Sequence, residues 1–323
     1  MVSVRDGRFC CMAGPGSGKT AVLTRRTVAL LQEGVSVDDT LNLSFTNTAA
    51  KNLTDRVEAQ VGKISTKRKA GATTFHGLCL ALAQEERNEF GFDLAEFPLA
   101  TEPVALKLSA QAGRRFEVDP RSLRSYVSIQ KRGRVRASQA VKRAEDKLDA
   151  AELKLALAYK QYDKSLREEG VLDFDSLIME AVELLSKKPA VRQRWVRDWI
   201  QVDEAQDCAY IEWELVRLIS GKSLLAVGDV SQGIYSFRGS DPKLFQEMEK
   251  MFPGTQVLYL GTNYRSSSAI VDFIRPYAAS EELATKFKSH SGDGPAPVVR
   301  GFLNAGDEAN WVIGQIKGEG DGN

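Results

Sequence analysis

The sequence has few of the residues that metal centres and disulfide frameworks need. Its 323 residues include four cysteines and two histidines, and no pair of cysteines has Cys-x-x-Cys spacing. Cys10 and Cys11 lie in an apolar run that indicates a buried strand, so we expect the cysteines to be reduced core residues. With only His76 and His290 available, a zinc site would need an unusual ligand set, and we predict no structural metal.

Long hydrophobic runs and a strong net charge are also absent. No stretch approaches the roughly 20 apolar residues that a membrane-spanning helix needs, and the first residues lack the apolar core of a signal peptide. These absences predict a cytoplasmic protein with no membrane partner. The formal net charge is +1, so a DNA site would have to rest on local motifs rather than on bulk attraction.

Short apolar segments alternate with helical patterns near the start of the chain and again after residue 170. The predicted strands are residues 9–13, 41–45, 199–204, 223–229 and 256–260, and the predicted helices near the start are 19–33 and 49–61. This alternation is typical of an α/β fold with a parallel sheet. Between residues 84 and 170 the strand pattern fades and charged helical patterns replace it, which indicates a helical insertion.

Basic residues outnumber acidic ones in the last part of this insertion, from Lys131 to Gly170. A solvated helix face and a patch that contacts the DNA backbone use the same residue types. Both interpretations stay open at the level of the sequence.

The strongest chemical signal is AGPGSGKT, which lies between a predicted strand and a predicted helix. This context is typical of a phosphate-binding loop, in which glycines let backbone amides surround the phosphates of a nucleotide. Lys19 would add positive charge at the outer phosphates, and the Thr20 hydroxyl would bind Mg²⁺. The predicted nucleotide-binding residues are Ala13, Gly14, Pro15, Gly16, Ser17, Gly18, Lys19 and Thr20.

An ATPase of this class also needs carboxylates at the end of a neighbouring strand, and VDEAQD at residues 202–207 supplies them. We predict that Asp203 holds Mg²⁺ and that Glu204 is the general base that polarises the attacking water. Adjacent acids after a strand also occur as helix N-terminal charges. The upstream phosphate loop favours the catalytic interpretation.

Several segments in series resemble one family. VDEAQD, followed by GDVSQGIYSFRGSD at 228–241 and TNYRSS at 262–267, is similar to the UvrD/Rep family of superfamily 1 DNA helicases. FTNTAAKNLTDRV, TFHGLCLAL and LDFDSLI also resemble segments of that family. The resemblance implies the cofactors ATP and Mg²⁺, DNA-stimulated ATP hydrolysis, 3′ to 5′ movement on single-stranded DNA and duplex unwinding.

Pattern and resemblance together predict the domain organisation. We expect an α/β fold in which residues 1–84 and 171–260 form a RecA-like domain with the parallel sheet of phosphate-loop NTPases. Residues 85–170 would be the helical insertion subdomain, and residues 261–323 would begin a second RecA-like domain.

The resemblance also assigns roles to single residues. Gln232 would sense the γ-phosphate and couple it to DNA. Arg265 would be an arginine finger that acts from the second motor domain on the transferring phosphoryl group. Tyr264 would stack on adenine. Without the family context, a lone Asn-Tyr-Arg sequence is a surface turn.

Sequence-independent grip on a single DNA strand needs aromatic faces for base stacking beside basic or polar groups for phosphates. Tyr235, Phe237 and Arg238 in IYSFRG meet this demand, and Phe237 stands where many relatives carry Trp. Phe45 and His76 are further candidates, from segments that line the DNA path in relatives. The alternative for Phe45 and Phe237 is an ordinary buried core aromatic.

Two parts of the family pattern are not found. Relatives carry a glutamine-containing segment that reads adenine ahead of the phosphate loop, whereas the twelve residues before Ala13 contain no glutamine. The two later motifs that complete the second motor domain are also not found. We therefore expect the chain to need further motor elements, either from a longer gene product or from a protein partner.

Three alternative functions stay open. One is an ATP-gated module that binds single-stranded DNA without autonomous unwinding, and another is the motor part of a helicase-nuclease. The third is a generic phosphate-loop ATPase, against which GDVSQGIYSFRG speaks because it places the predicted γ-phosphate sensor near aromatic residues. The sequence does not distinguish DNA repair from replication, or a phage from a plasmid context.

Overall fold

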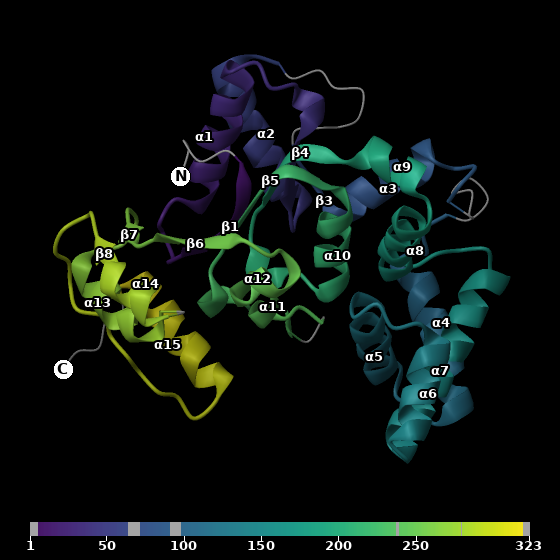
Figure 1. Ribbon diagram of the computed structural model, residues 1–323. Coiled ribbons are helices and arrows are strands. Elements are labelled where there is room, and N and C mark those ends of the chain that lie inside the picture. Colours follow the sequence, from purple (N-terminus) through teal and green to yellow (C-terminus); the bar gives the residue numbers. More distant parts are fainter. Residues whose placement is uncertain (1–5, 64–71, 91–97, 237–238, 279, 319–323) are drawn as a thin grey trace.

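The structure is a computed structural model that describes residues 6–63, 72–90, 98–236, 239–278 and 280–318 (Figure 1). Its centre is a six-stranded sheet in which neighbouring strands are parallel. In sheet order the strands are β3 (Ala72–Thr74), β2 (Thr40–Ser44), β4 (Arg197–Val202), β5 (Ser220–Gly228), β1 (Gly7–Ala13) and β6 (Thr255–Leu260). The predicted α/β class with a parallel sheet is confirmed.

β1 packs apolar side chains against both faces of the sheet. Cys10 and Met12 belong to the hydrophobic cluster on one face, whereas Phe9, Cys11 and Ala13 belong to the cluster on the other. Successive side chains of a strand point to opposite faces, so a strand buried on both faces needs a continuous apolar run. The segment FCCMA is such a run. The four cysteines are buried free thiols, as predicted.

Helices cover both faces of this sheet. α1 (Lys19–Gln32) and α2 (Asn47–Val61) pack Leu23 and Leu53 against the face that contains Phe9. The larger cluster on the opposite face includes residues of α3 (Phe75–Glu85), α8 (Phe174–Lys187) and α10 (Tyr210–Ile219). Shorter helices complete this part of the chain: η1 (Val37–Asp39), α9 (Pro189–Trp195), η2 (Ala205–Asp207), η3 (Val230–Gln232), α11 (Pro242–Gln246) and α12 (Met248–Met251).

The predicted helical region has a hydrophobic cluster of its own. Its helices are α4 (Glu102–Phe116), α5 (Pro120–Arg132), α6 (Ala137–Asp146) and α7 (Ala150–Glu168), which lie together in Figure 1. Ala140, Ala144 and Ala156 are buried in this cluster, and their small side chains let the helix backbones approach closely. The helical character of the region agrees with the sequence pattern, and the domain boundaries at residues 84 and 170 stay a prediction.

The basic run that begins at Lys131 makes ion pairs inside the protein. Lys131 is 1% exposed, and its Nζ lies 2.7 Å from Asp163 and 2.8 Å from Asp173. Nη2 of Arg132 lies 2.8 and 3.0 Å from the two carboxylate oxygens of Glu212 on α10. Further pairs join Arg134 to Glu214 and Arg136 to Glu180. For these four basic residues, internal pairing is favoured over contact with the DNA backbone.

The segment after β6 begins with β7 (Thr262–Asn263), which pairs in parallel with β8 (Lys288–Ser289). Around them lie α13 (Ser268–Ile274), η5 (Arg275–Tyr277), α14 (Glu281–Lys286) and α15 (Ala305–Lys317). The segment NYRSSSAIVDFIRPY has a helical pattern in the sequence, but its first residues are not helical. Asn263 Oδ1 accepts the backbone N–H groups of Arg265 and Ser266, and this local turn competes with a helix. Within the described ranges, none of the helices combines the length and apolar character that crossing a bilayer requires.

Candidate nucleotide and DNA site

The carboxyl ends of the parallel strands bring distant segments to one edge of the sheet. The phosphate loop follows β1, Phe45 follows β2, Asp203 follows β4 and Asp229 follows β5. Because these four strands are parallel members of one sheet, the residues that follow them lie at the same edge. Open α/β sheets bind ligands at such an edge.

The backbone of the phosphate loop requires glycine at two positions. Gly16 has a φ of 67° and Gly18 a φ of 84°, values in the left-handed region that side chains disfavour. α1 begins at Lys19, so its free N–H groups and the positive end of its dipole face the loop. Ser17 is buried and its Oγ donates to the Gly14 carbonyl at 2.6 Å. This geometry fits a phosphate group.

Glu204 of the acidic pair contacts the loop lysine directly. Lys19 Nζ is 3.0 Å from Glu204 Oε2, and the Lys19 side chain is only 11% exposed. The Asp203 N–H donates to the Leu43 carbonyl at 2.8 Å, which continues the contact between β4 and β2 to the end of the strand. Glu204 then turns out of the sheet with a left-handed φ of 48°. Three residues of the predicted catalytic set, Lys19, Asp203 and Glu204, are thus brought together.

Burial perturbs the carboxyls of this site. Loss of solvation and, next, the charge of Glu204 together raise the pKa of Asp203 to about 6, against the opposing effects of the Glu204 N–H and Lys19. The pKa of Asp207 is also raised to about 6, again first by burial and then by Glu204. Crowded carboxyls of this kind favour a cation or a proton among them.

A hydrogen-bonded chain links the acidic pair to the next strand end. Gln206 Nε2 donates to Glu204 Oε2 at 3.0 Å, and Gln206 Oε1 accepts the Asp229 N–H at 2.9 Å. Asp229 Oδ2 in turn accepts Gln232 Nε2 at 2.7 Å. Gln232 is therefore connected to Glu204 through two intermediates. Gln206 and Asp229 are not among the residues predicted from the sequence, although Gln206 lies inside VDEAQD.

The turn after β7 packs on the phosphate loop. Asn263 Nδ2 donates to the Pro15 carbonyl at 2.9 Å, and the Tyr264 N–H donates to the Gly16 carbonyl at 2.9 Å. The Tyr264 ring is 60% exposed, with its centroid 5.1 Å from that of His290. Arg265 follows with an exposed side chain. Tyr264 and Arg265 therefore lie beside the loop. Asn263, which makes the side-chain contact, is not among the residues predicted from the sequence.

Two of the predicted DNA contacts form an aromatic pair. The rings of Phe45 and Tyr235 stack with centroids 5.0 Å apart and an interplanar angle of 29°. Both side chains are half-buried rather than buried in the core, so the core interpretation of Phe45 is not supported. Phe237 and Arg238 lie outside the described residues.

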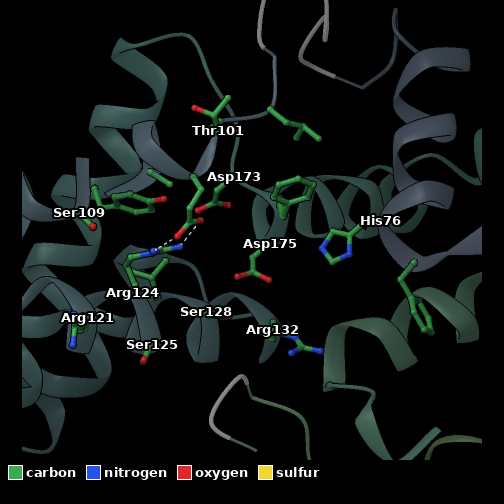
Figure 2. Close-up of a pocket in the computed structure, with 18 of the residues that line it drawn as sticks. His76, Thr101, Ser109, Arg121, Arg124, Ser125, Ser128, Arg132, Asp173 and Asp175 are labelled. Atoms are coloured by element: carbon green, nitrogen blue, oxygen red, sulfur yellow. Dashed lines mark hydrogen bonds and ion pairs between the residues drawn. The ribbon is translucent and has the colours of Figure 1, made fainter. Parts of the chain in front are cut away.

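His76, at the start of α3, lies beside a cavity of about 880 Å³ that residues of α4, α5, α8 and α10 also line (Figure 2). Its ring meets that of Phe174 edge to face at 5.5 Å, and the Phe174 side chain is 52% exposed. Burial lowers the pKa of His76. The lining also includes Phe45, Thr101, Arg121, Arg124, Ser125, Ser128, Arg132 and Asp175. Glu102, Asp173 and Glu212 also line the cavity, and Glu102 and Glu212 accept hydrogen bonds from Arg124 and Arg132. The cavity thus combines aromatic faces and hydroxyl groups with both acidic and basic side chains.

The chain is similar to known proteins over most of its length. A family model described as the UvrD/REP helicase N-terminal domain matches residues 1–253. The chain belongs to the UvrD/Rep helicase family. In this UvrD/Rep-family chain the match includes the phosphate loop, the acidic pair and the segment that carries Gln232 and Tyr235.

Curated relatives share the same resemblance over nearly the whole chain. The chain is 30% identical over 330 residues to the ATP-dependent DNA helicase UvrD1 of Mycobacterium tuberculosis. The aligned region covers 96% of this chain and 42% of the relative. The chain is 33% identical over 329 residues to the ATP-dependent DNA helicase PcrA of Staphylococcus epidermidis. That match covers 98% of this chain and 44% of the relative. PcrA of Staphylococcus aureus is 32% identical over the same length. This UvrD/Rep-family chain therefore spans less than half the length of these relatives.

Proposed function

We propose that this chain is the ATP-hydrolysing part of a DNA motor that moves 3′ to 5′ along single-stranded DNA and unwinds duplexes. The observation that carries the proposal is the contact between Lys19 and Glu204, at 3.0 Å, in front of a glycine loop that opens a helix. A loop lysine and an acid on a neighbouring strand end are the parts that phosphate-loop ATPases use. The names of the relatives, ATP-dependent DNA helicases, support the choice of substrate.

Glu204 is proposed as the general base. Its carboxylate faces Lys19 in the structure, and a bound triphosphate would compete for the same ammonium group. Once Lys19 turns to the phosphates, Glu204 is free to accept a proton from the attacking water. Gln206 keeps Glu204 in place during this exchange because it donates to the same oxygen.

The residues present fit Mg²⁺ beside the nucleotide. Mg²⁺ prefers oxygen ligands and uses one or two carboxylates together with phosphates and water. The Asp203 carboxylate is buried, 6% exposed, and its raised pKa marks a position that gains from a nearby cation. Asp203 and the Thr20 hydroxyl would hold the ion, which would neutralise charge on the outer phosphates.

Arg265 is proposed as the arginine finger and Tyr264 as the residue that stacks on adenine. Both follow Asn263, whose side chain and chain neighbour bind the phosphate loop. The exposed guanidinium of Arg265 would stabilise negative charge on the transferring phosphoryl group. In the proposed cycle, Arg265 would reach the transferring phosphoryl group only when the cleft between the two motor domains is closed.

Single-stranded DNA is proposed to bind at the stacked pair Phe45 and Tyr235 and along the cavity beside His76. Bases stack on aromatic faces without sequence preference, and Arg121 and the hydroxyl side chains of the cavity lining would bind the phosphates. Phe45 contacts Tyr235 directly and lines the cavity that His76 also lines. Gln232, three residues before Tyr235, joins this DNA site to the nucleotide site through Asp229 and Gln206.

The test is steady-state ATP hydrolysis with and without single-stranded DNA, in the unaltered chain and in Lys19→Ala, Glu204→Gln and Arg265→Ala. We expect DNA to raise the rate, and loss of the base to lower it by about 10²-fold or more. Loss of the finger is expected to cost about 10³-fold. Nucleotide binding without DNA-stimulated hydrolysis would contradict the motor and leave a nucleotide-gated DNA-binding module.

A further inference from the structure

The side chain of Asn263 joins the phosphate loop to the turn that carries Arg265. Asn263 is 0% exposed, and both ends of its amide are used. Nδ2 donates to the Pro15 carbonyl at 2.9 Å, while Oδ1 accepts the N–H groups of Arg265 at 2.7 Å and Ser266 at 2.8 Å. One amide group therefore contacts both parts of the nucleotide site.

The fit between Asn263 and the loop is close. A Cβ atom placed on Gly16 would lie 2.7 Å from Asn263 Oδ1 and 2.9 Å from its Cγ, a separation that real side chains do not tolerate. Gly14 is packed in the same way against the ring of Phe287. Glycine at position 16 thus serves the Asn263 contact as well as the left-handed backbone.

The bond to Pro15 also orients an amide of the loop. The peptide between Pro15 and Gly16 is planar and trans, so its C=O and N–H point in opposite directions. Since the Pro15 carbonyl is directed at Asn263 Nδ2, the Gly16 N–H is directed away from Asn263. The Tyr264 N–H donates to the Gly16 carbonyl at 2.9 Å and fixes the next peptide by the same means.

We propose that Asn263 is a positioning residue for ATP hydrolysis that presets the phosphate loop through Nδ2 and the Arg265 turn through Oδ1. This inference rests on the proposed ATPase function. The two contacts separate chemically: the donor should govern nucleotide affinity, and the acceptor should govern the rate step that needs Arg265. Asn263 acts through these neighbours and not by touching the reacting atoms.

Asn263→Ala removes both contacts, whereas Asn263→Ser keeps an oxygen that can accept the Arg265 N–H but is too short to reach Pro15. For Asn263→Ala we expect the KM for ATP to rise and kcat to fall, each by about five- to tenfold, the effect of losing one hydrogen bond. Asn263→Ser should recover most of kcat while KM stays raised. In an Arg265→Ala background, Asn263→Ala should not lower kcat further.

Asn304→Ala is the matched control, because Asn304 Oδ1 caps α15 through the Asp307 N–H at 3.0 Å, away from the loop. It should leave KM and kcat unchanged. Multiplicative losses of kcat with Arg265→Ala, or equal recovery of KM and kcat by serine, would overturn the proposal.

Lys19→Ala separates the failure of this inference from failure of the proposed function. If Lys19→Ala abolishes binding of a fluorescent ATP analogue and Asn263→Ala leaves binding and hydrolysis intact, only the role of Asn263 is wrong. If neither variant affects nucleotide binding, the proposed ATPase site is wrong as well. Thermal unfolding of each variant shows whether a loss reflects the fold, and Asn263→Ser supplies the comparison if Asn263→Ala is unstable.

Discussion

Gln206 donates a hydrogen bond from Nε2 to Glu204 Oε2, the same carboxylate oxygen that faces Lys19 Nζ. Gln206 is 1% exposed, and a Cβ atom on Gly228 would lie 2.6 Å from its Oε1. The side chain is therefore held between two strand ends by close packing. A change in the position of Glu204 has a direct hydrogen-bonded route to the Asp229 backbone.

Gln206→Glu tests this link with little change in shape. The new carboxyl can still accept the Asp229 N–H, but it replaces the donor to Glu204 with an acceptor beside two other acids. We expect ATP hydrolysis to fall at least about tenfold, because a hydrogen bond to a charged group is lost and repulsion is added. Steady-state hydrolysis is the measurement. Gln60→Glu, on the exposed surface of α2, is the control, and equal rates in the two variants would contradict the role of Gln206.

The stacked rings of Phe45 and Tyr235 predict a specific pattern of DNA affinities. Tyr235→Ala and Phe45→Ala should each weaken binding of single-stranded DNA by about 1 to 3 kcal/mol, the cost of losing one base-stacking surface. Because the rings contact each other, each substitution also frees its neighbour, and the double variant should lose less than the sum. Fluorescence anisotropy with a labelled oligonucleotide measures the affinities.

Phe273→Ala provides the comparison for this pair. Phe273 is an aromatic residue on α13 that is 47% exposed and outside the predicted DNA set. The Phe273→Ala variant should bind single-stranded DNA with the same affinity as the unaltered chain. An equal loss in Phe273→Ala and Tyr235→Ala would mean that exposed aromatic area in general, and not this pair, supports binding.

The strands that carry the site could be predicted from the sequence, because each is an apolar run followed by a chemical motif. β1 followed by the glycine loop and β4 followed by Asp203 and Glu204 are the clearest cases. β3 was missed because it is three residues long, Ala72–Thr74, and has no apolar run. Its place at the sheet edge comes from pairing with β2, which no local pattern encodes.

The residues that connect the site could not be predicted, because they act through contacts between distant segments. Asn263 meets Pro15 across 248 positions of sequence, and Arg132 meets Glu212 across 80. Asparagine in a turn and arginine on a charged helix are common, so neither residue type is informative alone. For the first four basic residues of the run after Gln130, the preference for internal pairing comes only from the carboxylates that the fold places against them.

The buried pair of Arg132 and Glu212 should hold the insertion helices on the sheet domain. Their side chains are 6% and 3% exposed, and the Ala209 N–H also donates to Glu212 at 2.6 Å. Glu212→Gln removes the bidentate carboxylate partner of a buried guanidinium, which should lower the free energy of unfolding by about 3 to 5 kcal/mol. Urea denaturation followed by circular dichroism measures the change.

The exposed pair of Arg124 and Glu102 is the matched control for this prediction. Glu102 has a 70% exposed side chain, and its bond to Arg124 joins α4 to α5. Glu102→Gln should therefore cost less than about 1 kcal/mol. A loss of similar size for the two glutamine variants would show that burial does not decide the strength of the Arg132 contact.

Burial of His76 predicts a dependence of stability on pH. Burial lowers the pKa of His76, and the charge of Arg132 lowers it further against the opposing effect of Glu212. In the unfolded chain the pKa of histidine is about 6.5. The unfolded chain therefore binds more protons than the folded chain in mildly acidic solution. The stabilising effect of a neutral His76 is complete above that pH and is lost as the pH falls below it.

His76→Gln should remove this part of the pH dependence. The difference in unfolding free energy between the variant and the unaltered chain should be constant above pH of about 7.5, where histidine is neutral in both states, and should shift in favour of the variant toward pH of about 5. Asp203 and Asp207, whose pKa values are raised to about 6, act in the opposite direction over this range. The comparison must therefore be between the two proteins at each pH, measured by urea denaturation without DNA. A difference that stays constant down to the lower pH would show that His76 takes up its proton equally well in the folded and unfolded chains.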